Sequence, residues 1–374
     1  MDILHVNKLY HPEVGGIERV VRDVAEGMQR RGHDNRVLVS TRRGWGGRDV
    51  VGGVPVTRTA SLGVAKSVPL APAFPLRYRR AARGVDVVHH HLPNPLGVVS
   101  HLLAVPADAT VVATYHSDIV RQRTALRVYR PFLQRFLAAV DHVFVTSPRL
   151  LDHSTHLAPH RGKCSVVPLS IDLDHYGTAA ASVPALPGDP DRPTLLFVGR
   201  LSYYKGVEYL LDAMSSVAAD LLVVGDGDRR DALEARADGL GVRDRVHFLG
   251  YVDDDRLRAC YDRADVFVLS SVEPSEAFGL VQLEAMSYGT PVVNTDLPTG
   301  VPWVSRDGET GLTVPPRDAE ALATALTTLL DDPERRRRYG ANARARVERR
   351  FGRERMLDAL EARYRALVAG DADR

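Results

Sequence analysis

Two glutamates lie eight positions apart in the segment "SSVEPSEAFGLVQLEAM", residues 270–286. They are Glu276 and Glu284, on either side of a Phe-Gly pair that follows an apolar, strand-like run. A carboxylate is a good bidentate acceptor for a vicinal diol. We expect Glu276 in the loop and a helix that begins near Gly279. Eight positions are about two helical turns, so Glu284 is expected near the same face as Glu276. The pattern predicts one acid for sugar hydroxyls and the other for ribose hydroxyls.

Two cations follow another apolar run in "FVGRLSYYKGVEYLLDAM". Arg200 and Lys205 lie in the loop after Gly199, and no nearby acid precedes Glu208 to pair with them. Arginine chelates phosphate oxygens in a fork and lysine supplies a point charge, so the loop suits a diphosphate. A solvated loop is the alternative. The helix after the glutamate loop would add free backbone N–H groups at its start, from Phe278, Gly279, Leu280 and Val281.

Two smaller features of the first half could also face a ligand. Gly15 and Gly16 follow the first strand, where glycine lets backbone N–H groups approach an anion at a helix start. A plain strand-to-helix turn explains them equally well. His116 ends the strand-like segment "TVVATYH", where a neutral imidazole can exchange one hydrogen bond with a substrate hydroxyl. A surface histidine satisfied by the protein is the alternative.

The sequence predicts no metal site and no cofactor. Asp253, Asp254 and Asp255 precede a helical stretch, so N-capping and the helix dipole explain them more simply than a metal does. Alternation along a strand places His89 and His91 on one face and His90 on the other. Two ligands on one strand make an incomplete metal site, so a polar strand end that lines a cleft is the preferred interpretation.

Short apolar β-branched runs alternate with helical stretches along the whole chain, which predicts parallel sheets covered by helices on both faces. The fold class is therefore α/β, with two facing Rossmann-like domains and an interdomain cleft at the carboxyl ends of the strands. We predict domains at 1–172 and 193–350. A linker at 173–192 joins them, and a C-terminal helix at 351–374 follows, which could pack back on the first domain.

The composition narrows the class of protein. The 374 residues carry 49 basic and 47 acidic side chains, a formal net charge of +2, so no global basic excess drives nucleic-acid binding. Only two cysteines are present, Cys164 and Cys260, which favours a reducing compartment, the cytoplasm. No signal peptide is indicated, and no apolar run reaches the roughly 18–20 residues of a membrane helix.

The Glu276–Glu284 spacing, "GRLSYYKG" and the Gly15–Gly16 loop together resemble the retaining glycosyltransferases of family four, which have the GT-B fold. The resemblance covers nearly the whole chain and includes "TYHSD" and "GETGLTVPP". One departure is "VEPSEAFGL", which is longer than the family's usual run. We take Glu276 as the first acid of the motif rather than Glu273, because only Glu276 has the spacing to Glu284.

The resemblance implies a nucleotide-diphospho-sugar donor bound mainly by the second domain and a sugar or lipid-linked acceptor bound mainly by the first. It implies Arg200 and Lys205 on the diphosphate, Glu284 on the ribose, Glu276 at the sugar ring and His116 near the donor sugar. No essential metal is implied. The segment "YHSDIVRQ" is similar in sequence to bacterial polysaccharide mannosyltransferases, and this similarity favours GDP-mannose as the donor.

Two other functions stay open at this point. A nucleotide-sugar 2-epimerase also uses two facing Rossmann-like domains, and it needs further acids and histidines for proton abstraction. A non-catalytic nucleotide-sugar-binding protein would not need Glu276. A nicotinamide dehydrogenase is disfavoured, because "VVGDGDRRDAL" has Gly225 and Gly227 but lacks the third glycine of the fingerprint.

The stretch 119–140 concentrates positive charge without any acid. Pro131 interrupts it, so we predict one kinked helix or two short ones, with an apolar face beside a basic face. Such a face suits an anionic membrane surface or a lipid-linked diphosphate, and a solvated helix face is the alternative. The acceptor or membrane candidates are Arg121, Arg123, Arg127 and Arg130, and a second basic cluster contains Arg77, Arg79, Arg80 and Arg83.

Overall fold

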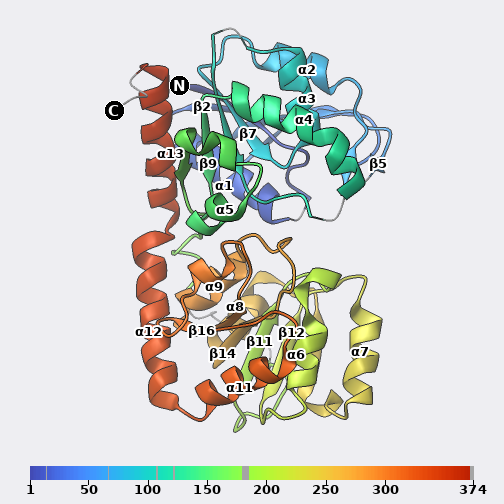
Figure 1. Ribbon diagram of the computed structural model, residues 1–374, viewed down its shortest axis with the longest axis vertical. Coiled ribbons are helices and arrows are strands. Elements are labelled where there is room, and N and C mark those ends of the chain that lie inside the picture. Colours follow the sequence, from blue (N-terminus) through green and yellow to red (C-terminus); the bar gives the residue numbers. More distant parts are fainter. Residues whose placement is uncertain (14, 66, 107, 121–122, 179–184, 371–374) are drawn as a thin grey trace. The chain divides into compact units, whose positions relative to one another are not determined.

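The computed structural model describes residues 1–374 except 14, 66, 107, 121–122, 179–184 and 371–374 (Figure 1). The chain divides into two compact units. The first contains Met1–Leu169 and Arg353–Arg374, and the second contains Ser170–Gly352. The described part of the predicted linker belongs to the second unit, where Arg192 Nη1 donates to Asp220 Oδ1 at 3.1 Å.

The first unit is built on an eight-stranded sheet of order β10-β9-β8-β7-β1-β2-β4-β3. Its pairings are parallel except for the β3–β4 hairpin. The strands are β1 (Asp2–Val6), β2 (Asp34–Ser40), β3 (Gly47–Val51), β4 (Val54–Thr59), β7 (Val87–Leu92), β8 (Thr110–Tyr115), β9 (His142–Val145) and β10 (Cys164–Val166). The chain leaves β1 to one side through β2 and to the other through β7, so the strand order reverses between β1 and β7. Ligands of such sheets bind beside this reversal point.

Helices cover the first sheet. They are α1 (Gly16–Arg30), α2 (Phe74–Ala81), α3 (Pro95–Leu103), α4 (Arg123–Ala139), α5 (Pro148–His153) and α13 (Arg353–Val368). α2 packs against α3 and α3 against α4, as Figure 1 shows. The predicted kinked or divided helix at 119–140 is a single helix, α4, with Pro131 inside it. Apolar side chains of α2, α4 and strands β1, β7 and β8 form the core, including Phe74, Tyr78, Phe136 and Leu137.

Three strands of the first sheet and one small hairpin were not predicted from apolar runs. The predicted runs correspond to β1, β2, β7, β8 and β9, whereas β3, β4 and β10 were not predicted. β3 lies at the sheet edge and is largely exposed, so it has no continuous apolar run. β10 has only three residues. A two-stranded pair, β5 (Val64–Ala65) with β6 (Val68–Pro69), was also not predicted.

The second unit is built on a six-stranded, fully parallel sheet of order β13-β12-β11-β14-β15-β16. The strands are β11 (Thr194–Val198), β12 (Asp220–Val224), β13 (Val246–Gly250), β14 (Val266–Leu269), β15 (Val292–Thr295) and β16 (Gly311–Val314). All six correspond to predicted apolar runs. β11, β12, β14 and β15 are buried along their whole length, as expected of strands covered on both faces, whereas the edge strands β13 and β16 are partly buried. The strand order reverses between β11 and β14.

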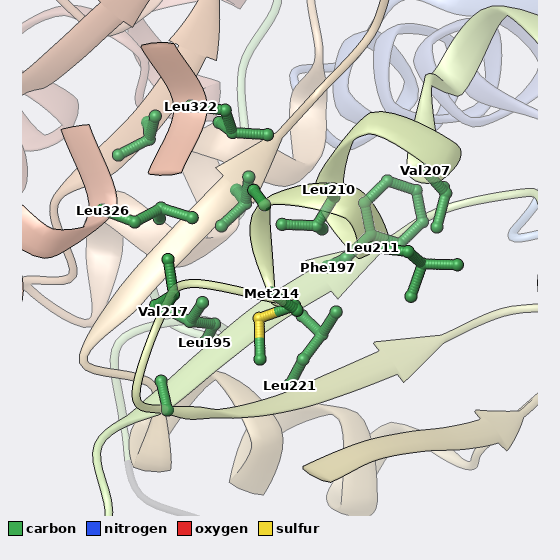
Figure 2. Close-up of a cluster of buried hydrophobic side chains, with 14 of the residues drawn as sticks. Leu195, Phe197, Val207, Leu210, Leu211, Met214, Val217, Leu221, Leu322 and Leu326 are labelled. Atoms are coloured by element: carbon green, nitrogen blue, oxygen red, sulfur yellow. The ribbon is translucent and has the colours of Figure 1, made fainter. Parts of the chain in front are cut away.

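The helices of the second unit are α6 (Val207–Ala213), α7 (Arg230–Gly239), α8 (Asp254–Arg263), α9 (Leu280–Ser287), α10 (Val301–Val304), α11 (Ala319–Leu330) and α12 (Pro333–Arg350). Figure 2 shows the core that α6 and α11 form over β11 and β12, with Leu210, Leu322 and Leu326 beside Leu195 and Phe197. Each such side chain contributes about 1.5–3 kcal/mol when it is fully buried. This packing fixes the strand ends that carry the loops described below. Within the described residues, no helix combines the length and the apolar character needed to span a membrane.

Candidate functional site

Lys205 and Glu276 meet at the carboxyl edge of the second sheet. Lys205 lies in the loop after β11 and Glu276 in the loop after β14, so the two loops flank the point where the strand order reverses. Lys205 Nζ donates to Glu276 Oε2 at 2.6 Å, and Ser271 Oγ donates to the same oxygen at 3.0 Å. Both charged side chains are buried. The expectation that Lys205 has no acid to pair with was therefore wrong: its partner comes from 71 residues further along the chain.

This ion pair keeps Lys205 charged. Burial disfavours the Lys205 ammonium, but the attraction and hydrogen bond of Glu276 outweigh it, so the pKa of Lys205 is raised above its usual value. An ammonium has three donors, and Glu276 uses one of them. Glu276 Oε1 forms no hydrogen bond with the described residues, so each partner keeps hydrogen-bonding capacity for a ligand.

The two loops approach closely because glycine occupies the contact points. A side chain at Gly206 would overlap the Ser270 carbonyl oxygen, and the positive φ of 62° at this residue also favours glycine. At Gly199 a Cβ would crowd the Lys205 ammonium at 3.1 Å. These glycines let Lys205 lie against the sheet edge beneath the β14 loop.

Arg200 lies in the same loop as Lys205 but in a different environment. Its side chain is exposed, and it forms no ion pair with any carboxylate that the structure describes. An arginine without a protein partner keeps its planar set of donors for a phosphate or carboxylate ligand.

Glu284 lies in α9 and is buried, where its Oε2 accepts a hydrogen bond from Tyr261 Oη at 2.6 Å. The prediction that Glu276 lies in the loop and that a helix begins near Gly279 is confirmed. α9 begins at Leu280, so Glu276 precedes it in the loop and helical spacing does not apply to this residue. Gly279 caps the helix in a left-handed conformation at φ 72°, which ends the loop and starts the helix in one step.

Phe278, Gly279, Leu280 and Val281 occupy the junction predicted for them, at the start of α9. The Phe278 side chain is buried and packs near Trp303 and Phe351. Glu273, the other acid of the loop, forms a surface ion pair with Arg317 at 3.0 Å. The structure thus separates the two acids, because Glu276 reaches the buried lysine and Glu273 does not.

In the first unit, Gly15 is the N-cap of α1 and Gly16 is its first residue. A side chain at Gly15 would overlap the Glu18 carboxylate, which folds back over the start of α1. Glu18 is partly buried, and burial raises the pKa of its carboxyl group. A hydrogen bond from its own backbone N–H and the charge of Lys8 oppose this shift. The start of α1 therefore already carries an acid, a feature that the glycine pair alone did not indicate.

His116 follows β8 and is buried rather than exposed. Its Nε2 lies 3.2 Å from His91 Nδ1, whereas its Nδ1 is buried and has no hydrogen-bond partner among the described residues. Burial, and then the charge of Lys8, lowers the pKa of His116 to about 3, so the imidazole is neutral near pH 7.

Alternation along β7 is as predicted. His90 contacts Tyr78 on one face, while His89 and His91 lie on the other with ring centroids 4.2 Å apart. The sequence interpretation missed a third histidine, His5 of β1. Ligand atoms of His5, His89 and His91 all lie within 4.8 Å of one another. Both His89 nitrogens already have hydrogen-bond partners, Tyr364 Oη at 2.6 Å and Thr114 Oγ1 at 2.7 Å, so protein contacts account for this imidazole.

The remaining candidates are simpler. Asp253 Oδ1 accepts from the Arg256 N–H at 2.8 Å and caps α8, which confirms the capping interpretation. Asp254 lies 2.9 Å from His175 Nε2. Of the basic candidates, Arg121 lies outside the described residues, and the side chain of Arg123 does too. Arg127 and Arg130 are exposed on α4.

Comparison with known proteins decides the family. Residues 14–175 match Glycosyltransferase Family 4, and residues 182–346 match Glycosyl transferases group 1. The chain is 37% identical to D-rhamnosyltransferase WbpZ of Pseudomonas aeruginosa, over 94% of this chain and 92% of the relative. This chain belongs to the family 4 glycosyltransferases. The resemblance inferred from Glu276, Glu284, Arg200 and Lys205 is thereby confirmed.

Two further comparisons extend this result. The glycosyltransferase is 32% identical to O-antigen chain mannosyltransferase C of Escherichia coli, over 98% of this chain and 99% of the relative. The solved sucrose-phosphate synthase of Thermosynechococcus elongatus superposes with a TM-score of 0.82 at 26% identity and covers 99% of both chains. The fold is therefore GT-B, with a parallel sheet in each of two Rossmann-like units, and the protein is a hexosyltransferase.

Proposed function

We propose that this glycosyltransferase moves a hexose from a nucleotide-diphospho-sugar to an acceptor hydroxyl, with retention of anomeric configuration and without a metal ion. The observation that carries the proposal is the buried Lys205–Glu276 pair at the strand-order reversal, with Arg200, which has no ion-pair partner among the described residues, in the same loop. Lys205 and Arg200 would bind the diphosphate, and Glu276 would accept a hydrogen bond from the sugar ring.

The charges of this edge suit bond cleavage at the anomeric carbon. When the bond between sugar and diphosphate breaks, negative charge develops on the diphosphate. Fixed cations and the free N–H groups at the start of α9 stabilise that charge more than they stabilise the intact donor. Glu276 Oε2 accepts hydrogen bonds from Lys205 and Ser271, so the other carboxylate oxygen, Oε1, would orient the sugar. A phosphate oxygen of the leaving group would take the proton of the acceptor hydroxyl.

We propose GDP-mannose as the donor. The named sugars of the two relatives are D-rhamnose and mannose, and D-rhamnose is 6-deoxy-mannose, so both have the manno configuration. The first unit would bind the acceptor, a growing polysaccharide or a lipid-linked sugar.

A donor panel tests this proposal. We expect GDP-mannose to raise the melting temperature of the enzyme and to be hydrolysed slowly without acceptor, in the presence of EDTA. UDP-glucose, UDP-N-acetylglucosamine and ADP-glucose serve as comparisons. Release of an epimerised nucleotide-sugar would identify a 2-epimerase instead, and binding without any turnover in the presence of acceptor would leave a binding protein.

Glu284→Gln is expected to weaken nucleoside-diphosphate binding about tenfold, because a charged hydrogen bond to the ribose is replaced by a neutral one. Isothermal titration calorimetry with GDP measures this change. Glu273→Gln is the matched control, since Glu273 lies in the neighbouring loop and pairs with Arg317 on the surface. Equal affinity for GDP in the Glu284→Gln variant and the parent would rule out the ribose role.

We further propose that the α2–α3–α4 surface of the first unit binds anionic membrane at the cytoplasmic face. Exposed arginines lie beside exposed apolar side chains there: Val128 of α4 and Leu103 of α3 are each 71% exposed, and Leu76 of α2 is 54% exposed. The arginines form no ion pair with a carboxylate that the structure describes; they are Arg77, Arg79, Arg80, Arg83, Arg127, Arg130 and Arg135. Cations that surround apolar side chains are typical of a surface that binds anionic headgroups.

Arg127→Glu combined with Arg130→Glu is expected to lower binding to vesicles rich in phosphatidylglycerol by at least thirtyfold. Each cation contributes about 1 kcal/mol at such a surface. Sedimentation with anionic and with zwitterionic vesicles, at low and high salt, measures the effect. Arg337→Glu with Arg349→Glu, on exposed positions of α12, is the charge-matched control. Equal binding to both vesicle types, or none to either, would indicate a soluble acceptor and a solvated α4 face.

A further inference from the structure

A line of polar side chains crosses four neighbouring strands of the first sheet and ends at His116. Asn35 lies on β2, His5 on β1, His91 on β7, and His116 follows β8. The strand register makes the line regular. Asn35 pairs with Ile3, His5 pairs with His89, and His91 pairs with Thr114. Each member of the line therefore lies two residues beyond the partner of the previous one, on the same face and nearer the carboxyl edge.

The members are joined by hydrogen bonds. His5 Nε2 lies 3.1 Å from Asn35 Oδ1, and His91 Nε2 lies 3.5 Å from His5 Nδ1. His91 Nδ1 lies 3.2 Å from His116 Nε2. All four side chains are buried, so they exchange hydrogen bonds with one another rather than with bulk water.

Asn35 sets the direction of this line. Its Nδ2 donates to the His33 carbonyl oxygen at 3.0 Å, and a carbonyl oxygen can only accept. The amide therefore turns its Oδ1 toward His5, and that oxygen can only accept in turn. His5 must carry its proton on Nε2, which leaves His5 Nδ1 as an acceptor.

The three histidines of the line are neutral, so each donates one hydrogen bond and accepts one. Burial lowers the pKa of His5 to about 4 and that of His116 to about 3, and it holds the pKa of His91 well below its ordinary value. A neutral imidazole has one N–H and one acceptor nitrogen. His91 must then donate from Nε2 to His5, and His116 must donate from Nε2 to His91. The nitrogen that remains, His116 Nδ1, is an acceptor.

We propose that Asn35, His5 and His91 are positioning residues that hold His116 in the tautomer protonated at Nε2, so that Nδ1 accepts a hydrogen bond from a hydroxyl of the donor sugar. The inference rests on the proposed transfer reaction for the identity of the ligand. His116 Nδ1 is buried and has no partner among the described residues, as expected of an atom whose partner is the substrate.

This assignment selects among ligand groups. An acceptor nitrogen binds a hydroxyl or another N–H, and it repels the lone pairs of phosphate and carboxylate oxygens. His116 is therefore suited to a sugar hydroxyl and not to a diphosphate. The histidine neither donates a proton to the leaving group nor carries charge, so it orients the sugar rather than acting as a general acid.

The tautomer can be measured without any substrate. Long-range ¹H–¹⁵N correlation spectra of the ¹⁵N-histidine-labelled enzyme distinguish a protonated ring nitrogen from an acceptor ring nitrogen. The signals of His116 are identified by their loss in His116→Gln. We expect Nδ1 to be the acceptor nitrogen of His116 in the free enzyme. An acceptor at Nε2 would overturn the relay, and this result is independent of whether the proposed donor is right.

A matched pair of variants tests the role of the relay in transfer. His91→Met removes both hydrogen bonds at similar volume, whereas His91→Gln keeps one donor and one acceptor. We expect His91→Met to give a mixture of His116 tautomers and about tenfold lower kcat/KM with GDP-mannose, with an unchanged affinity for GDP. His91→Gln should restore most of both properties. A single unchanged tautomer in His91→Met, or kcat/KM equal to that of the parent, would overturn the proposal.

Discussion

Lys205→Ala is expected to reduce kcat at least a hundredfold and to destabilise the second unit at the same time. Loss of a fixed donor that stabilises developing charge costs about 3 kcal/mol of the activation barrier. The substitution also leaves Glu276 buried without its ion-pair partner, and breaking a buried pair typically costs about 3–5 kcal/mol of folding stability. Steady-state kinetics and urea unfolding measure the two effects separately.

The double variant Lys205→Met with Glu276→Gln separates the two roles of this ion pair. It removes both charges, so we expect most of the lost stability to return. Activity should remain as low as in Lys205→Ala, because the diphosphate still lacks its cation. If the double variant regained activity together with stability, Lys205 would be a structural residue and the diphosphate assignment would be wrong.

Arg200→Ala is expected to lower kcat about a hundredfold without a measurable change in stability. Arg200 is exposed and forms no ion pair with the described carboxylates, so its removal costs the folded protein nothing beyond solvent contacts. Its forked donors would be lost to the leaving diphosphate, at about 3 kcal/mol. Arg200→Lys should recover activity only in part, because an ammonium cannot chelate two oxygens in a plane.

The control for this variant is Arg337→Ala, an exposed arginine of α12 in the same unit. Both variants remove one surface guanidinium, and the described residues supply no ion-pair partner to either. A similar kcat for Arg200→Ala and Arg337→Ala would contradict the proposed role of Arg200.

The parallel strands were predictable because burial on both faces leaves a continuous apolar run in the sequence. "TLLFVGR" and "VFVLSS" identified β11 and β14, together with the loops that carry Arg200, Lys205 and Glu276. Strand β3 was not predicted because it is exposed at the sheet edge and has no continuous apolar run. Strand β10 was not predicted because it is too short to show such a run.

The pairings within the site could not be predicted in the same way. Lys205 and Glu276 meet because β11 and β14 are neighbours in the sheet, and the order of strands is not visible in the spacing of residues. The same holds for His5, which lies 84 residues before His89 in the chain but opposite it in the strand register. The loop position of Glu276 and the helix that carries Glu284 were, by contrast, predicted from the sequence. The helix starts between the two glutamates, at Leu280 after the Gly279 cap.

The alternation of residues along a strand predicts which face a histidine lies on, but not which residues of neighbouring strands it contacts. Alternation correctly placed His89 and His91 on the face opposite His90. It gave no indication that His91 lies between His5 and His116, because that contact depends on a two-residue offset between neighbouring strands. The function of the relay therefore depends on sheet order, whereas its members are recognisable in the sequence only as polar residues at strand ends.

The configuration of the transferred sugar tests the central claim most directly. The enzyme is incubated with GDP-α-mannose and EDTA without any other acceptor, so that water receives the mannosyl group. The anomeric signals of the released mannose are recorded by ¹H NMR before mutarotation. The account predicts α-configured product formed at the same rate with and without EDTA, and loss of the reaction in Lys205→Ala. β-Configured product, or a reaction that requires added Mg²⁺ or Mn²⁺, would contradict it.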